Sequence, residues 1–153
     1  MYCVAIDPGQ TTGIAYVRDE QHPWHIEFRQ LGPEEHHADL ASQLRYWAPS
    51  IVVCESFENR ANEAALIISA EYIGVVKAYG QEYGRPVVWQ SAATGKAFWT
   101  DDKLRKHNLF ARGMKHARDA CRHYLYYRTF TLKDQSLLQG GRSLYVGEDQ
   151  KAQ

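Results

Sequence analysis

In the stretch Ala5-Ile6-Asp7-Pro8-Gly9-Gln10-Thr11, one carboxylate ends an apolar segment and the chain then turns sharply. Residues 2–6 are mostly β-branched or apolar, which predicts a buried strand. Pro8 and Gly9 favour a tight turn, and the next residues predict a second strand. Asp7 would then lie at the lip of a sheet, where open α/β sheets bind ligands. A solvated turn aspartate is the alternative explanation of this motif alone.

Two further acidic positions point to the same kind of site. Residues 50–54 predict another short buried strand, and Glu55 follows it directly. An acid on a buried strand is costly unless it is paired or binds a cation. Nearer the C-terminus, helical spacing places His116 and Asp119 on one helix face. Together these residues predict an oxygen-rich Mg²⁺ or Mn²⁺ site.

Each of these residues also has a simpler explanation. Glu55 could cap the helix that follows it. His116 could be a surface residue of a basic helix. Asp119 could pair with Lys115 or Arg122, which flank it on the same helix. The case for a metal site therefore rests on the ordered set.

The ordered set resembles RuvC-type Holliday junction resolvases, which belong to the RNase H-like, or retroviral integrase, superfamily. The resemblance covers residues 1–127. It rests on the turn motif Asp7–Gly13, on Val53-Cys54-Glu55, on the long helix that follows, and on His116-Xaa-Xaa-Asp119-Ala120. Residues 95–100 and 122–127 resemble bacteriophage members in particular. Actin-like ATPases have a similar Asp-Xaa-Gly turn, but their fold needs two domains and a much longer chain.

The resemblance implies an α/β, RNase H-like fold with a mixed five-stranded sheet flanked by helices. It implies a nuclease that uses Mg²⁺, with Mn²⁺ as a substitute. Two cations roughly 4 Å apart can clamp the attacking and leaving oxygens of a phosphodiester. By resemblance, Asp7 bridges both ions, while Glu55 and Asp119 hold or share them. His116 would be a ligand or would position water, and His123, one turn beyond Asp119, could support the site or simply pack.

Junction recognition is expected after the strand-end glutamate. By resemblance, Phe57 matches an aromatic residue that stacks on a base, and Arg60 matches a nearby basic residue. This match requires a one-residue deletion, and a core position under the helix start is the alternative for Phe57. Lys96 matches a lysine that contacts phosphate in the family.

The charge distribution favours nucleic acid although the net charge is zero. Residues 1–85 hold six Lys/Arg and twelve Asp/Glu, whereas residues 86–153 hold twelve and six. A basic excess beside a metal site suits a phosphate backbone, and a solvated helix face is the alternative. The residues expected to contact DNA in this half are Lys96, Lys103, Arg105, Lys106, Lys115, Arg118 and Arg122.

The rest of the pattern predicts one domain over residues 1–130. The strands are expected at 2–6, 12–18, 24–30, 51–54 and 86–90, and the main helices at 33–47, 59–83, 91–98 and 116–127. Periodicity fades near residue 130, which predicts a C-terminal tail or arm over 131–153.

The long helix predicted over residues 59–83 is apolar around most of its circumference. Such a helix must be covered on two sides. We expect the sheet to cover one side and the same helix of a second subunit to cover the other, in a two-fold homodimer. The resemblance implies a homodimer as well, with one active site per subunit. We expect the substitution Ile73→Glu to disrupt this interface, because it would bury an unpaired charge in the dimer.

Cysteine usage and hydropathy predict the setting of the protein. The three cysteines are dispersed, which predicts reduced, buried thiols and a cytoplasmic location, in the host cell if the origin is a phage. No apolar run is long enough for a membrane span, and a strand starting at Tyr2 leaves no room for a signal peptide. We predict a structure-selective endonuclease that resolves four-way DNA junctions. The alternatives are a related nuclease acting on branched or flap DNA or RNA:DNA hybrids, and a non-cleaving DNA-binding module.

Overall fold

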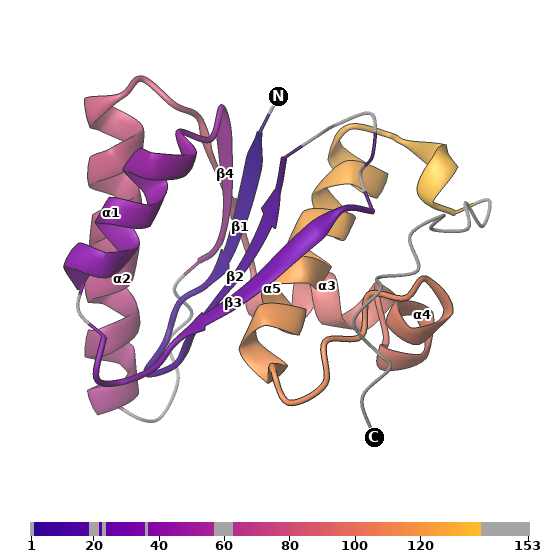
Figure 1. Ribbon diagram of the computed structural model, residues 1–153, viewed down its shortest axis with the longest axis horizontal. Coiled ribbons are helices and arrows are strands. Elements are labelled where there is room, and N and C mark those ends of the chain that lie inside the picture. Colours follow the sequence, from indigo (N-terminus) through magenta and orange to yellow (C-terminus); the bar gives the residue numbers. More distant parts are fainter. Residues whose placement is uncertain (1, 19–21, 23, 36, 57–62, 139–153) are drawn as a thin grey trace, which may run out of the picture.

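The computed structural model describes residues 2–18, 22, 24–35, 37–56 and 63–138. Its elements form three layers, with a sheet between two groups of helices (Figure 1). The strands are β1 (Cys3–Asp7), β2 (Thr12–Val17), β3 (Ile26–Leu31), β4 (Ile51–Glu55) and β5 (Val87–Gln90). The helices are α1 (His37–Trp47), α2 (Glu63–Glu82), α3 (Ala92–Phe98), α4 (Asp101–Lys106) and α5 (Lys115–Tyr126).

The predicted mixed five-stranded sheet is confirmed. Its strand order is β3-β2-β1-β4-β5, in which β1–β2 and β2–β3 are antiparallel and β1–β4 and β4–β5 are parallel. Ile6 lies opposite Cys54 in the register of β1 and β4. Asp7 follows Ile6 and ends β1, and Glu55 follows Cys54 and ends β4. The two acids therefore lie at the same edge of the sheet.

The two faces of the sheet have separate cores, as strand alternation requires. Val4 and Ile6 pack with residues of α1 and α2, which cover one face. Cys3 and Ala5 pack with residues of α4 and α5 on the other face. The three cysteines are buried, as predicted.

Gly13 explains how α5 comes to lie directly on the sheet. A β-carbon built on Gly13 would lie 2.0 Å from the carbonyl carbon of His116. The glycine of the turn motif is therefore needed for packing, because any side chain would push the first turn of α5 away. Ala117 and Ala120 are fully buried and allow the same close approach.

The element boundaries differ from the predictions mainly at helix ends. The first helix begins at His37, not at Pro33, because the chain makes a turn at Gly32, whose carbonyl accepts from the N–H of Glu35. After α5 the helix continues as a π-helical segment to Thr131. No helix in the described residues is long and apolar enough to cross a membrane.

The segment predicted as a tail from residue 131 begins as part of the packed structure. Arg128 and Asp134 form an ion pair, and Leu137 is fully buried in the core beside α5. The described part of this segment therefore packs against the core as far as Leu137. Residues 139–153 lie outside the described residues.

Helix α2 has a different buried face from the one that the sequence indicated. Ile73 is only 7% exposed and packs in the core with Tyr72, Val76 and Tyr79, so it is not available to a second subunit. The sheet and α1 together cover more of the apolar surface of α2 than we expected. Ile67 is 60% exposed and marks the outer side of α2.

Candidate metal centre

Three side chains from three elements meet at the carboxyl edge of the sheet. Asp7 ends β1, Glu55 ends β4, and His123 comes from the last turn of α5. One ligand atom from each lies within 4.8 Å of the others, and all three residues are buried. Carboxylates with an imidazole form a donor set that fits Mn²⁺ well and Mg²⁺ acceptably. The two strand-end acids thus lie close together in the structure, as the sequence indicated.

His116 lies beside this group and contacts Asp7. Its Nδ1 is 2.9 Å from Oδ2 of Asp7. The first turn of α5 is fixed by Gln30 of β3, whose side-chain oxygen accepts from the backbone N–H groups of His116 (2.9 Å) and Ala117 (3.4 Å). Gln30 therefore caps α5, a role that the sequence analysis did not assign, because it depends on two elements 86 residues apart.

Asp119 is buried near the site but is held by cations of the chain itself. Its carboxylate accepts from Arg122 and lies 3.1 Å from Nζ of Lys96. The same Nζ lies 3.9 Å from Glu55 Oε2. The pairing of Asp119 with Arg122, one of the alternatives from sequence, is therefore present. Among the described residues, the close group of ligand atoms includes Asp7 and Glu55 but not Asp119.

The pKa values of the two strand-end acids are displaced in opposite directions. Burial raises the pKa of Asp7, and the nearby Glu55 adds to this rise against the hydrogen bond with His116. Burial would also raise the pKa of Glu55, but hydrogen bonds with His123 and Asp7 and the charge of Lys96 outweigh it and lower the value. Two acids with divergent pKa values are typical of functional sites.

His123 is completely buried, and both of its ring nitrogens have partners. Nδ1 is 2.9 Å from Oε1 of Gln90, and Nε2 is 3.1 Å from Oε2 of Glu55. From sequence, His123 was expected only to support the site or to pack. Its seven-residue spacing from His116 was the available signal, because residues seven apart share a helix face. The sequence gives no sign that Gln90 completes the contact.

The residues predicted to bind DNA differ in their contacts and in their exposure. Phe57 and Arg60 lie outside the described residues. The Nζ of Lys103 donates to the carbonyl of Phe98 at 2.7 Å. Arg105 pairs with Asp102, and Lys106 and Lys115 are exposed.

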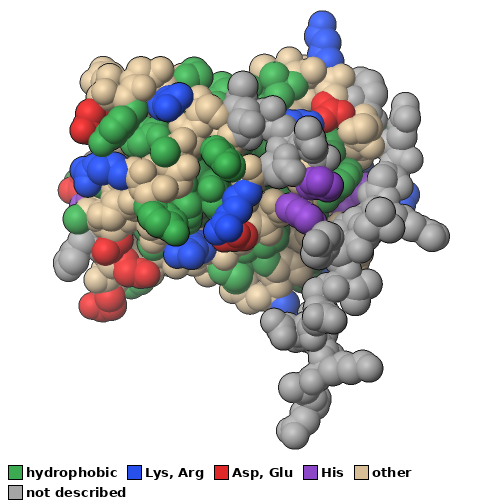
Figure 2. Space-filling model, turned by 45° about the horizontal axis from the view of Figure 1, so that its top comes forward, with side chains coloured by type: hydrophobic (Ala, Val, Ile, Leu, Met, Phe, Trp, Pro, Cys, Tyr) green, Lys and Arg blue, Asp and Glu red, His purple; other side chains and the backbone are tan. Residues whose placement is uncertain are grey.

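Arg118 and Arg122 are mostly buried, which differs from the expected solvent-facing basic run. Arg118 donates to the carbonyl of Ala111 at 2.8 Å and lies over a phenylalanine ring. Arg122 donates to the carbonyl of Trp99 at 2.7 Å and binds Asp101 and Asp119. These contacts stabilise the packing of α3, α4 and α5. On the face shown in Figure 2, Lys and Arg side chains are scattered among acidic ones.

Comparisons with known proteins identify solved structures with the same fold. No family model and no curated protein sequence matches the chain. The structure of Thermus thermophilus RuvC in complex with a Holliday junction substrate is 18% identical, with a TM-score of 0.62; the match covers 88% of this chain and 96% of that chain. The yeast mitochondrial Holliday junction resolvase Ydc2 is 12% identical, with a TM-score of 0.53, over 90% and 85% of the two chains. The chain thus has the RNase H-like fold of RuvC.

Proposed function

We propose that this chain is a metal-dependent endonuclease that resolves four-way DNA junctions. The observation that carries the proposal is the convergence of Asp7 and Glu55, from neighbouring parallel strands, on a buried group backed by α5. This arrangement occurs on a fold shared with two proteins whose names describe them as acting at Holliday junctions. Buried acids at a sheet edge are costly unless they are paired or bind a cation.

The chemistry proposed is hydrolysis of a phosphodiester. A bound Mg²⁺ or Mn²⁺ would supply an activated water and neutralise charge on the phosphate. Asp7 and Glu55 would hold the ion, and His116 would orient the Asp7 carboxylate through its Nδ1 contact. Lys96, whose side chain is 40% exposed, supplies a positive charge to the incoming phosphate from the same edge.

A two-ion version of this site requires a movement within the chain. Asp119 and Glu55 would share the second ion, but the ammonium of Lys96 lies between them in the structure. In our proposal Lys96 turns from these carboxylates to the DNA phosphate when the site is loaded. Its partial exposure leaves room for this change of rotamer.

We also propose that the active form is a homodimer. A four-way junction presents two equivalent strands, and two active sites related by a two-fold axis would cut both. The surface proposed for the contact is the outer side of α2, where Ile67, Ala70 and Gly74 are exposed at helical spacing. Of these, Ala70 and Gly74 are small and would permit two helices to approach closely, while Ile67 offers apolar surface for the contact.

One experiment tests the function directly. The full chain is incubated with Mg²⁺ or Mn²⁺ and matched four-way, flap, RNA:DNA hybrid and linear duplex substrates of the same sequence. We expect paired, symmetric incisions in the four-way substrate, and complete inhibition by EDTA. Preferential cleavage of the flap or hybrid would favour another nuclease of this fold. Binding to junctions without cleavage by any divalent metal would favour a non-cleaving DNA-binding module.

A further inference from the structure

The candidate metal centre contains a polar contact of His123, a residue other than His116 and Asp119 of the sequence motif. His123 is fully inaccessible to solvent, and it lies between Gln90 of β5 and Glu55 of β4. A buried imidazole must satisfy both ring nitrogens, and the partner of one nitrogen decides which of them carries the proton.

The contact with Gln90 defines the tautomer of the ring. Oε1 of Gln90 only accepts hydrogen bonds, so Nδ1 at 2.9 Å must donate to it. A neutral ring then has its lone pair on Nε2, and this lone pair faces Oε2 of Glu55 at 3.1 Å. Two acceptors at this distance repel each other, so a positive charge must lie between them. Without a metal, a proton on Nε2 supplies that charge, and the imidazolium then donates to both Gln90 and Glu55. A metal ion at the centre of the group would replace that proton, because Asp7 completes the ligand set around the same point.

We propose that His123 is the nitrogen ligand of this metal centre, and that Gln90 is a positioning residue that fixes its Nε2 lone pair toward the ion. The inference rests on the proposed metal-dependent function and deepens it, since it changes the ligand set from the one indicated by the sequence motifs. In this proposal His116 does not ligate the ion. It is partly exposed, and its Nδ1 contacts Asp7 instead. Ligating histidines generally donate their other ring N–H to an oxygen acceptor, as His123 does.

The reversed amide of Gln90 is the competing arrangement. Its amino group would then donate to Nδ1, and the ring would donate from Nε2 to Glu55, leaving no lone pair for a metal. The Nε2 atom of Gln90 is buried and has no hydrogen-bond partner among the described residues. Either orientation leaves one amide atom of Gln90 without a partner, so spectroscopy must decide between them.

The test uses pulsed electron paramagnetic resonance of Mn²⁺ bound to the full chain. Coordination by a histidine nitrogen produces ¹⁴N modulation, which changes to a ¹⁵N signal when the protein is labelled with ¹⁵N-histidine. This measurement needs no substitution, so it does not depend on a variant that folds poorly. We expect the histidine signal in the wild-type protein.

Two matched variants identify the ligand. His116→Gln and His123→Gln alter the two histidines of α5 that contact a site carboxylate, at 2.9 and 3.1 Å. We expect the nitrogen signal to persist in His116→Gln and to disappear in His123→Gln. Loss of the signal in His116→Gln, or no nitrogen signal in the wild type with Mn²⁺ bound, would overturn the proposed role of His123. Neither result would count against the metal centre itself. Failure of Mn²⁺ to bind, or binding unchanged by Asp7→Asn, would overturn the metal centre itself.

Gln90 is tested by removing and then restoring the acceptor. Gln90→Leu should weaken Mn²⁺ binding about 10- to 100-fold, the usual effect of losing a partner of a ligating histidine, and should reduce the nitrogen signal. Gln90→Glu keeps an acceptor oxygen and should restore the signal. The signal is the relevant measure for this variant, because its added charge raises affinity by itself. A full signal in Gln90→Leu would contradict the positioning role.

Discussion

Asp7 is a residue whose proposed function conflicts with folding. Its pKa is raised by burial and by Glu55, so the folded protein holds a proton that the unfolded chain has already released. Between the unfolded and folded pKa values of Asp7, its contribution to stability therefore falls as pH rises, and above the folded value the loss is complete. A site acid with this property lowers stability at neutral pH until a cation binds.

The corresponding prediction concerns Asp7→Asn. We expect a higher melting temperature than wild type at pH 7–8 without metal, a flatter decline of stability with pH, and no cleavage. Mn²⁺ should raise the melting temperature of the wild type more than that of the variant, because a ligand stabilises only the state that binds it. Asp102→Asn is the control, since Asp102 is an exposed acid of α4. A variant less stable than wild type at pH 8 would contradict this account.

Arg122 carries a second prediction at this scale, and it revises the expectation of a DNA contact. Arg122→Gln removes the buried partner of Asp119 and should destabilise the fold by about 3–5 kcal/mol, the usual cost of breaking a buried pair. Lys115→Gln, at the exposed start of the same helix, should leave stability unchanged. It should weaken DNA binding and lower the salt slope by about 1. Urea denaturation and binding at several salt concentrations give the two measurements. Equal stability with weaker binding in Arg122→Gln would restore the original expectation.

At the scale of elements, the end of the chain supplies a test of the domain boundary. Leu137 is fully buried beside α5, although the sequence pattern placed it in a tail. Leu137→Ala should destabilise the domain by about 2–4 kcal/mol, as truncation of core leucines does. Leu138→Ala is the matched control, because Leu138 is exposed. Equal unfolding midpoints in urea for the two variants would place the boundary near residue 130, as the sequence predicted.

The sequence predicted the strands and the acids at their ends, and the reason is local. β1 and β4 are continuous apolar segments whose last residue is an acid, so the pattern contains both the strand and the site. The contacts made by Gln30 and Gln90 could not be predicted, because each depends on α5 meeting a strand from a distant part of the sequence. The buried face of α2 was assigned wrongly at Ile73, since an almost uniformly apolar helix gives no clear direction.

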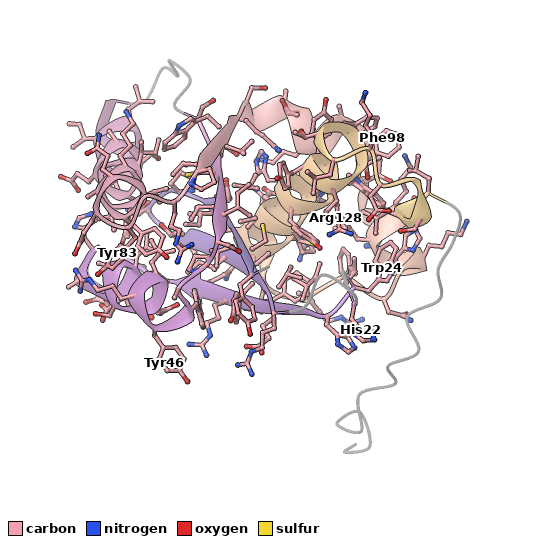
Figure 3. The ribbon with its side chains drawn as sticks, turned by 90° about the horizontal axis from the view of Figure 1, so that it is seen from above. His22, Trp24, Tyr46, Tyr83, Phe98 and Arg128 are labelled. Atoms are coloured by element: carbon pink, nitrogen blue, oxygen red, sulfur yellow. The ribbon has the colours of Figure 1, made fainter. Side chains whose placement is uncertain are left out.

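The whole molecule is where the proposed dimer can be tested. The outer side of α2 is exposed at Ile67, so Ile67→Glu should leave the stability of the monomer unchanged. If this side forms the two-fold contact, the variant should sediment as a monomer and fail to make paired incisions. Tyr46→Glu on α1 is the control, because Tyr46 is the most exposed large apolar residue of the helical layer and points away from it (Figure 3).

Two results would count against this assembly. A wild-type protein that stays monomeric at micromolar concentration, with and without junction DNA, would remove the dimer. An Ile67→Glu protein that remains dimeric would move the contact to another surface. Ile73→Glu is unsuitable for this test, because a charge at this buried position would unfold the subunit itself.

The ion pair between Asp119 and Arg122 has a consequence for how lineages of this chain would decay. If the chain has the proposed activity, then in a descendant released from selection for it, replacing Asp7 relieves an electrostatic cost, whereas replacing Asp119 takes a carboxylate from a buried arginine. Drift should therefore erase Asp7 early and retain Asp119 for as long as the fold survives. Such descendants would keep the helical half of the motif, so an intact Asp119 would indicate ancestry, and only Asp7 would indicate that the proposed activity persists.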